Sequence, residues 1–151
     1  MQLNAYLNFN GNCEEALKFY ERHLGGKIEH KMTWGEMPPM PDNADPGCGD
    51  APNLPAGWET KIMHARMTLG NGIIMASDVP PHMYAPAGGI EMTINVDDPK
   101  EAERLFNALS DGGKVKMPLM ETFWAEKFGS LTDKFGIPWM INCEGRMKQA
   151  A

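Results

Sequence analysis

Residues 12–32 (NCEEALKFYERHLGGKIEHKM) and residues 98–117 (DPKEAERLFNALSDGGKVKM) carry the same order of local signals. Each stretch begins with a helix-capping Asn or Asp, continues as an amphipathic helix, stops at a Gly-Gly pair and resumes as an apolar strand led by lysine. A strand-like segment precedes each copy, at 3–10 and at 90–96. Neither copy is large enough to bury its own sheet face. The repeat therefore predicts an α+β fold of two βαβββ modules, which form a curved mixed sheet around a cleft with the helices on the outer face.

Each predicted helix carries signals for its start and its buried side. Asn12 is the expected cap of the first helix, with Glu15 as the return partner of a capping box. Asp98 is the expected cap of the second helix, and Pro99 takes its first helical position. The expected buried residues are Ala16, Phe19, Tyr20 and Leu24 in the first helix and Ala102, Leu105, Phe106 and Leu109 in the second.

The remaining segments are expected to complete a single domain over residues 1–151. The predicted parts are module one at about 1–78, a proline-rich linker at 79–89 and module two at about 90–144. Further strands are expected at 27–34, 61–69, 72–78, 114–119 and 137–143, with METFWAEKFGSLTD (120–133) between the last two. The long loop at 37–60 is rich in Pro, Gly, Asp and Asn and has no periodicity, so we expect it to act as a flap.

Composition limits the classes of partner. The chain has 151 residues, of which 42% are hydrophobic and 23% are charged, and its net charge is -6. This charge disfavours binding to nucleic acid or to an anionic membrane, because such polyanions are bound by basic surfaces. No apolar stretch reaches the length of a membrane span, and the first residues lack the order of a signal peptide.

The cysteines point to a reducing compartment. Cys13, Cys48 and Cys143 are odd in number and widely spaced, and the chain has no CxxC pair. We therefore interpret them as free thiols and expect a cytoplasmic protein.

Two stretches resemble a known family. FNGNCEEALKFYERHLGG (9–26) and ETFWAEKFGSLTDKFGIPWMINCE (121–144) are similar to the PhnB-like (YjdN-like) family. That family belongs to the vicinal oxygen chelate superfamily, with glyoxalase I, bleomycin-resistance proteins, fosfomycin-resistance proteins and extradiol dioxygenases. The resemblance implies paired βαβββ modules, a homodimer, and clefts lined by both modules. It does not imply one reaction.

The resemblance also bears on metal binding. Metal-using members of the superfamily place His or Gln on the first strand, Glu on the fourth, His on the fifth and Glu on the eighth. The corresponding positions here hold Ala5, Met75 or Ala76, Glu91 and Met140. Only Glu91 is a good ligand for a hard divalent ion, and tight binding needs two or three protein ligands. We therefore expect no metal site and no cofactor; the alternative is an unusual ligand set in which His64 or Asp78 substitutes.

Two polar residues on predicted strands are candidate ligand-binding residues. Alternation places His64 and Arg66 on the strand face opposite the apolar Ala65 and Met67, where His64 could act as a hydrogen-bond donor or general base. A structural histidine is the alternative. Glu91 alternates with apolar neighbours, and its carboxylate could lie in the cleft or on a solvated edge.

Aromatic residues near the end of the chain are the other candidates. Glu121, Phe123 and Trp124 lie in a break between strands, where rings would supply apolar area and the acid would orient a ligand. The same rings could instead fill a dimer contact or cap the core. Trp139 on the last strand is expected to line the same cleft, and Asp133 is expected to serve a turn.

These observations favour a small-molecule binding protein, or a degenerate enzyme that works without metal. The alternative is a divalent-metal lyase, isomerase or dioxygenase of the glyoxalase superfamily that uses His64 and Glu91. A third hypothesis is an interaction module that dimerises through Phe123 and Trp124. All three expect a homodimer, and the first two expect a small-molecule ligand.

Overall fold

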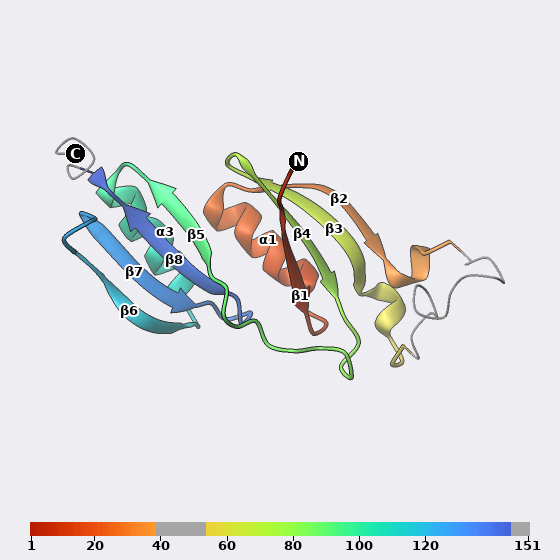
Figure 1. The fold of residues 1–151 in the computed structure, drawn as a ribbon. Helices are drawn as coiled ribbons and strands as arrows, with labels where there is room; N and C mark the ends of the chain where they lie inside the picture. The colour runs from red at the N-terminus through yellow and green to blue at the C-terminus, as the bar shows by residue number, and fades with distance from the viewer. Residues whose placement is uncertain (39–53, 146–151) are drawn as a thin grey trace. The chain divides into compact units, whose positions relative to one another are not determined.

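The computed structural model describes residues 1–38 and 54–145. The chain forms two compact units, Met1–Ala85 and Pro86–Ala151, and each contains a four-stranded mixed sheet and one α-helix (Figure 1). The boundary between the units lies within the linker predicted at 79–89. Most of the flap predicted at 37–60, together with Cys48, lies outside the described residues.

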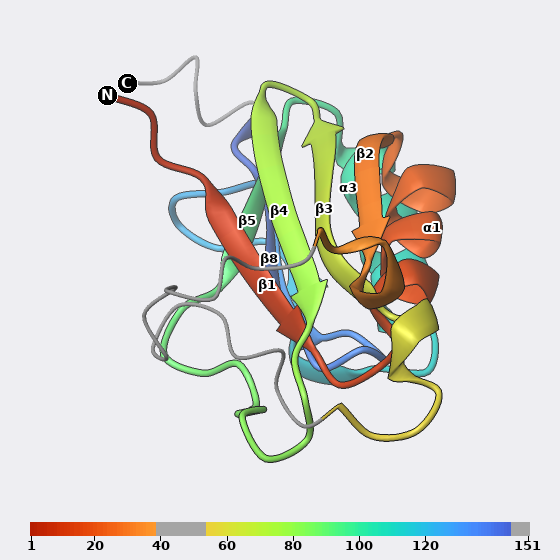
Figure 2. The ribbon, with the colours of Figure 1, turned by 90° about the vertical axis from the view of Figure 1, so that its right-hand side faces the viewer.

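The first unit follows the predicted order of elements. Its sheet has the strand order β1-β4-β3-β2, which Figure 2 shows from one side. β1 pairs with β4 in parallel, and the other pairs are antiparallel. β1 and β2 therefore run in the same direction at opposite edges, with the helix as the crossover. The elements are β1 (Ala5–Phe9), α1 (Cys13–Leu24), β2 (Lys27–Thr33), β3 (Ile62–Leu69), β4 (Gly72–Asp78) and the short 3-10 helices η1 (Trp34–Glu36) and η2 (Trp58–Thr60).

The second unit repeats this topology strand for strand. Its sheet has the order β5-β8-β7-β6, with the β5–β8 pair parallel and the other pairs antiparallel. The predicted α+β class and the two βαβββ modules are thus confirmed, although the strands form two separate sheets rather than one. The elements are β5 (Met92–Val96), α3 (Pro99–Ser110), β6 (Lys114–Met120), β7 (Lys127–Thr132) and β8 (Pro138–Cys143).

The buried side of α3 is the predicted one, whereas that of α1 differs. All four predicted residues of α3 are buried. In α1, Leu17 is buried in place of Phe19, whose ring is half-buried and packs on His23 at a centroid distance of 4.4 Å. Leu17 and Phe19 lie on opposite flanks of the stripe of Ala16 and Tyr20, and the flank of Leu17 is the buried one. Leu24, also predicted to be buried, is half-buried. Cys13, Ala16 and Tyr20 complete the buried side.

The start of α1 also differs from the prediction. The side chain of Asn12 makes no capping hydrogen bond, so the capping box with Glu15 was wrong. The carboxylate of Asp78, at the end of β4, accepts a hydrogen bond from the backbone N–H of Cys13 instead, at 2.9 Å. In the second unit Asp98 does cap its own helix, accepting from the N–H of Lys100 at 3.0 Å.

Each helix covers one face of its own sheet, and the opposite face is called here the open face of that unit. Side chains alternate between the two faces. In β3, Ala65 and Met67 are buried on the helix side, whereas His64 and Arg66 are partly exposed on the open face, as predicted.

Candidate functional site

The open face of the second unit carries rows of side chains fixed by the strand register. One row runs Thr93–Met140–Ser130 across β5, β8 and β7, and the next runs Asn95–Asn142–Phe128. The residues that alternate with them in β8 are Trp139, Ile141 and Cys143, all of which are buried beneath α3. The open face is therefore mixed in character, with hydroxyl, amide, thioether and aromatic groups.

An ion pair joins the two edges of this face. Glu91 directly precedes β5, and Lys116 lies in β6 at the opposite edge of the sheet. Their carboxylate oxygen and ammonium nitrogen are 2.8 Å apart. Adjacent strands are about 4.8 Å apart, so the edge strands are separated by about 14 Å, and these two long side chains reach toward one another over the intervening strands.

A cavity of about 650 Å³ adjoins this ion pair. Its polar lining consists of Glu91, Lys116 and the hydroxyls of Thr93 and Thr132. Its apolar lining includes Ile90, Pro138 and Met140, and residues 87–89 form part of its wall. An apolar floor with a few convergent polar groups is the usual composition of a small-molecule site, and the volume falls in the ordinary range.

An aromatic cluster lies at the other end of the same sheet. The rings of Phe123 and Trp124 meet edge to face at 4.6 Å between centroids, and Trp124 meets Phe128 at 5.4 Å. Phe123 is 89% exposed and Trp124 is 44% exposed. Phe128, which the sequence reasoning missed, pairs with Asn142 in the register, so it joins the cluster to the open face.

Asn142 has an unsatisfied polar atom beside this cluster. Its Nδ2 donates to Oδ1 of Asn95 at 3.0 Å. Its own Oδ1 is buried and has no hydrogen-bond partner among the described residues. Glu121, predicted to act with the aromatic residues, is exposed at the start of the connection between β6 and β7.

Trp139 does not line the open face. It is 1% exposed, and its indole Nε1 donates to Oδ2 of Asp133 at 2.8 Å. Oδ1 of Asp133 accepts from the backbone N–H groups of Phe135 and Ile137, both at 2.9 Å, so Asp133 has the turn-forming role predicted for it. The expectation that Trp139 would line the cleft placed it on the wrong face of β8, because Asp133 holds its indole within the core.

His64 lies on the open face of the first unit. Its Nδ1 is 3.4 Å from the hydroxyl oxygen of Tyr6, with the ring centroids 6.0 Å apart. The neighbouring Arg66 is paired with Glu29 at 2.8 Å. His64 and Tyr6 thus form a polar pair on the open face of the first unit.

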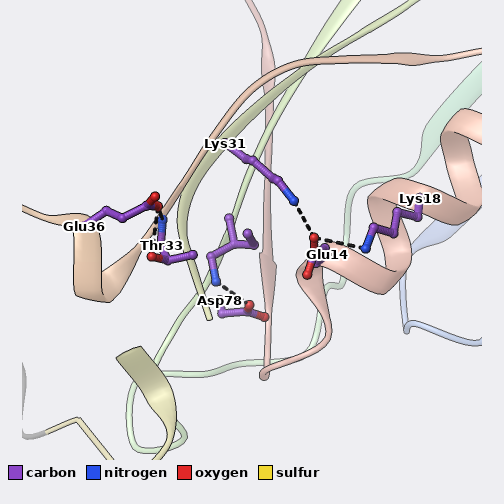
Figure 3. Close-up of polar contacts among 7 residues, drawn as sticks. Glu14, Lys18, Lys31, Thr33, Glu36 and Asp78 are labelled. Carbon is purple, nitrogen blue, oxygen red and sulfur yellow. Dashed lines mark hydrogen bonds and ion pairs between the residues drawn. The ribbon is translucent and has the colours of Figure 1, made fainter. Parts of the chain in front are cut away.

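A smaller cavity of about 270 Å³ lies at the start of α1. Asp78 lies at its base, with Oδ1 bonded to Cys13 N–H and Oδ2 to Ile62 N–H at 3.0 Å. At its rim, Glu14 forms ion pairs with Lys18 and Lys31 (Figure 3). Burial raises the pKa of the Cys13 thiol, and the negative charges of Asp78 and Glu14 raise it further. A neutral thiol and a fully bonded carboxylate indicate a structural role.

The residues at the superfamily's metal positions do not fit a metal. Ala5 and Ala76 have no donor, and Met75 and Met140 offer thioethers, which bind hard divalent ions poorly. Among these positions Glu91 alone offers a carboxylate, and tight binding needs two or three protein ligands. Within residues 1–38 and 54–145, no three His, Cys, Asp or Glu side chains come together as a metal centre requires.

Comparison with known proteins identifies the family. The model of the Glyoxalase/Bleomycin resistance protein/Dioxygenase superfamily matches residues 2–141. The chain belongs to this superfamily. Members of the superfamily bind small molecules, which accords with an open sheet face that carries a cavity.

Relatives within the superfamily confirm the resemblance to the PhnB-like (YjdN-like) family. The protein YjdN of Escherichia coli (strain K12) is 39% identical over 142 residues, which cover 94% of this chain and 95% of YjdN. The crystal structure of PA1353 from Pseudomonas aeruginosa is 46% identical, with a TM-score of 0.81, over 96% of this chain and 98% of that one. The PhnB protein of Bacillus cereus is 24% identical, with a TM-score of 0.73, over 95% of this chain and 99% of that one, a likeness of fold. No helix among the described residues of this superfamily member is long and apolar enough to cross a membrane.

Proposed function

We propose that the chain binds a small molecule on the open face of its second unit, using its own side chains rather than a metal. The observation that carries the proposal is the cavity of about 650 Å³ beside Glu91 and Lys116. Met140 and Pro138 supply apolar contact area, and a methionine floor adapts to different ligand shapes. The hydroxyls of Thr93 and Thr132 can fix the orientation of a polar group.

Filling the cavity tests this proposal. The probe is anilinonaphthalene sulfonate, an aromatic anion whose fluorescence rises in apolar sites. We expect saturable binding to the unaltered protein, and a loss of at least about tenfold in affinity for Thr93→Trp, because the indole would occupy the cavity. Asn107→Trp adds the same ring at an exposed position of α3 and should bind the probe as the unaltered protein does. Equal binding by Thr93→Trp would refute the site.

We also propose that the chain forms a homodimer through the outer edge of the second sheet. β6 is an edge strand, and an edge strand offers unpaired backbone groups to a partner. Val115 and Met120 of this strand are 43% and 49% exposed, and Phe123 beyond it is 89% exposed. Exposed apolar groups gathered in this way are typical of a contact surface.

The variant Trp124→Ala separates an interface role from a pocket role. Light scattering would give the mass of both proteins, and the anilinonaphthalene sulfonate titration would give their binding. A monomeric variant of a dimeric parent supports the interface. An intact dimer with lost probe binding would show that the aromatic cluster itself contacts the ligand, and a parent that is monomeric at every concentration refutes the homodimer.

A further inference from the structure

Opposite charges lie side by side in the cavity of the second unit. The Glu91 carboxylate and the Lys116 ammonium are 2.8 Å apart, and both line the same space as Met140 and Pro138. The Lys116 side chain is 42% exposed and that of Glu91 is 22% exposed, so a ligand can reach both groups. A ligand in this cavity therefore meets a negative and a positive group at once, above an apolar floor.

The ion pair can exchange partners at low cost. A partly exposed pair of this kind contributes about 0–1 kcal/mol to stability, so little is lost when its members turn toward a ligand. A ligand with only a negative charge competes with Glu91 for Lys116, and a ligand with only a positive charge competes with Lys116 for Glu91. A ligand that carries both charges pairs with both side chains and leaves neither without a partner.

We propose that this cavity selects small zwitterions with an apolar body, the chemical class of the free amino acids. The inference rests on the proposed small-molecule site and deepens it. The ligand's ammonium group pairs with Glu91, and its anionic group pairs with Lys116. Its apolar body packs on Met140 and Pro138, beside the hydroxyls of Thr93 and Thr132.

Three probes of matched shape test the charge requirement: phenylalanine, phenylpropionate and phenylethylamine. Phenylalanine carries both charges, and the other two carry one each on the same apolar body. We expect ligand-observed NMR titrations to give an affinity for phenylalanine about tenfold or more above that of either analogue, since two charge-assisted contacts form instead of one. Comparable affinities for phenylalanine and either analogue would overturn the proposal.

Variants assign each charge to its partner. Glu91→Gln should reduce the affinity for phenylalanine to that for phenylpropionate, and Lys116→Gln should reduce it to that for phenylethylamine. Exchanging the two residues (Glu91→Lys with Lys116→Glu) restores both charges and should restore the preference for the zwitterion. Lys127→Gln is the matched control, because Lys127 pairs with Glu103 at 2.9 Å and does not line the cavity. Unchanged binding of phenylalanine by Glu91→Gln would also overturn the proposal.

The outcomes separate this inference from the proposed function. If anilinonaphthalene sulfonate binds the unaltered protein but not Thr93→Trp, and phenylalanine shows no advantage, the site stands and the zwitterion preference is refuted. If neither the dye nor phenylalanine binds the unaltered protein, both proposals are refuted.

Discussion

Asp78, at the end of β4, caps the start of α1 although it lies 65 residues further along the chain. Its Oδ1 accepts from the backbone N–H of Cys13 at 2.9 Å, and its Oδ2 accepts from that of Ile62 at 3.0 Å. One buried carboxylate thus ties the end of β4 to the starts of α1 and β3. Trp34 adds a fourth segment, because its indole Nε1 donates to the Asp78 backbone carbonyl at 3.1 Å. In the second unit the corresponding helix, α3, is capped by Asp98, the residue that directly precedes it. The first turn of the helix thus has a carboxylate acceptor in both units, but only in the first unit does this acceptor come from a distant strand.

Removing the Asp78 carboxylate should destabilise the first unit. Asp78→Ala leaves two buried N–H groups without acceptors, and we expect a loss of about 2–5 kcal/mol in the free energy of unfolding. Asp78→Asn keeps one acceptor and should lose about 1–3 kcal/mol. Urea titrations followed by tryptophan fluorescence would measure both. Asp98→Ala, which removes an exposed cap, is the control and should cost no more than about 1–2 kcal/mol. Equal effects of Asp78→Ala and Asp98→Ala would contradict the linking role.

Gly129 is required by the packing of α3 on β7. A Cβ built at this position would lie 2.7 Å from Cε2 of Phe106 and 2.9 Å from Cα of Leu119. We expect Gly129→Ala to lower the free energy of unfolding by about 1–3 kcal/mol, because both neighbours must move. Gly72→Ala is the control, since its Cβ would meet only the Leu69 carbonyl oxygen at 3.4 Å. A thermal melt that shows no difference between the two variants would contradict the packing argument.

Glu14 should make a small, pH-dependent contribution to stability. Hydrogen bonds from Lys31, and then from Lys18, hold the pKa of the Glu14 carboxyl below its usual value. A carboxyl whose pKa is lowered by folding stabilises the folded state above its unfolded pKa of about 4.3, and this contribution disappears as the pH falls through the folded pKa. Because Glu14 is 40% exposed, solvent screening limits the effect. We expect Glu14→Gln to cost less than about 1 kcal/mol at neutral pH, and a smaller amount at about pH 3, below the unfolded pKa. Urea unfolding at both pH values checks this, and an equal cost at both would contradict the assignment.

The buried thiols should be unreactive in the folded protein. Burial is the main cause that raises the pKa of both the Cys13 and the Cys143 thiol. The fraction of each thiol that is ionised at pH 8 is therefore below that of a free cysteine. A group whose pKa is raised by folding adds stability below its unfolded pKa, near 8.5 for a thiol, and this stability is lost as the pH rises above that value. In a Cys48→Ser variant, iodoacetamide should modify neither thiol until urea unfolds the chain, as read by mass spectrometry. Rapid modification of the native protein would contradict the burial of these two residues.

The repeated pattern of capping residue, amphipathic helix, Gly-Gly and strand was enough to predict the two modules, although no strand was assigned to the stretch that forms β7. Local signals of this kind act within a few residues, so they can be read without a structure. The buried stripe of α3 could be predicted for the same reason. The cap of α1 could not, because Asp78 lies 65 residues from Cys13 and no local pattern connects them.

The candidate site also could be predicted only in part. The sequence predicted Glu91, Phe123 and Trp124 as candidate ligand-binding residues from their type and their position. Only the tertiary structure brought Lys116 within 2.8 Å of Glu91 and placed the ring of Phe128 beside that of Trp124. Trp139 lies in a strand with apolar residues on both faces, so the sequence could not assign it to one face. Its hydrogen bond to Asp133 shows that it points into the core.

By itself the sequence determined the elements, their order and their duplication, because helix and strand periodicity and turn chemistry act over short stretches of chain. The tertiary structure decided which side chains meet across the sheets, because strand pairing joins residues far apart in the chain and a shift of one residue reverses the face to which each side chain points.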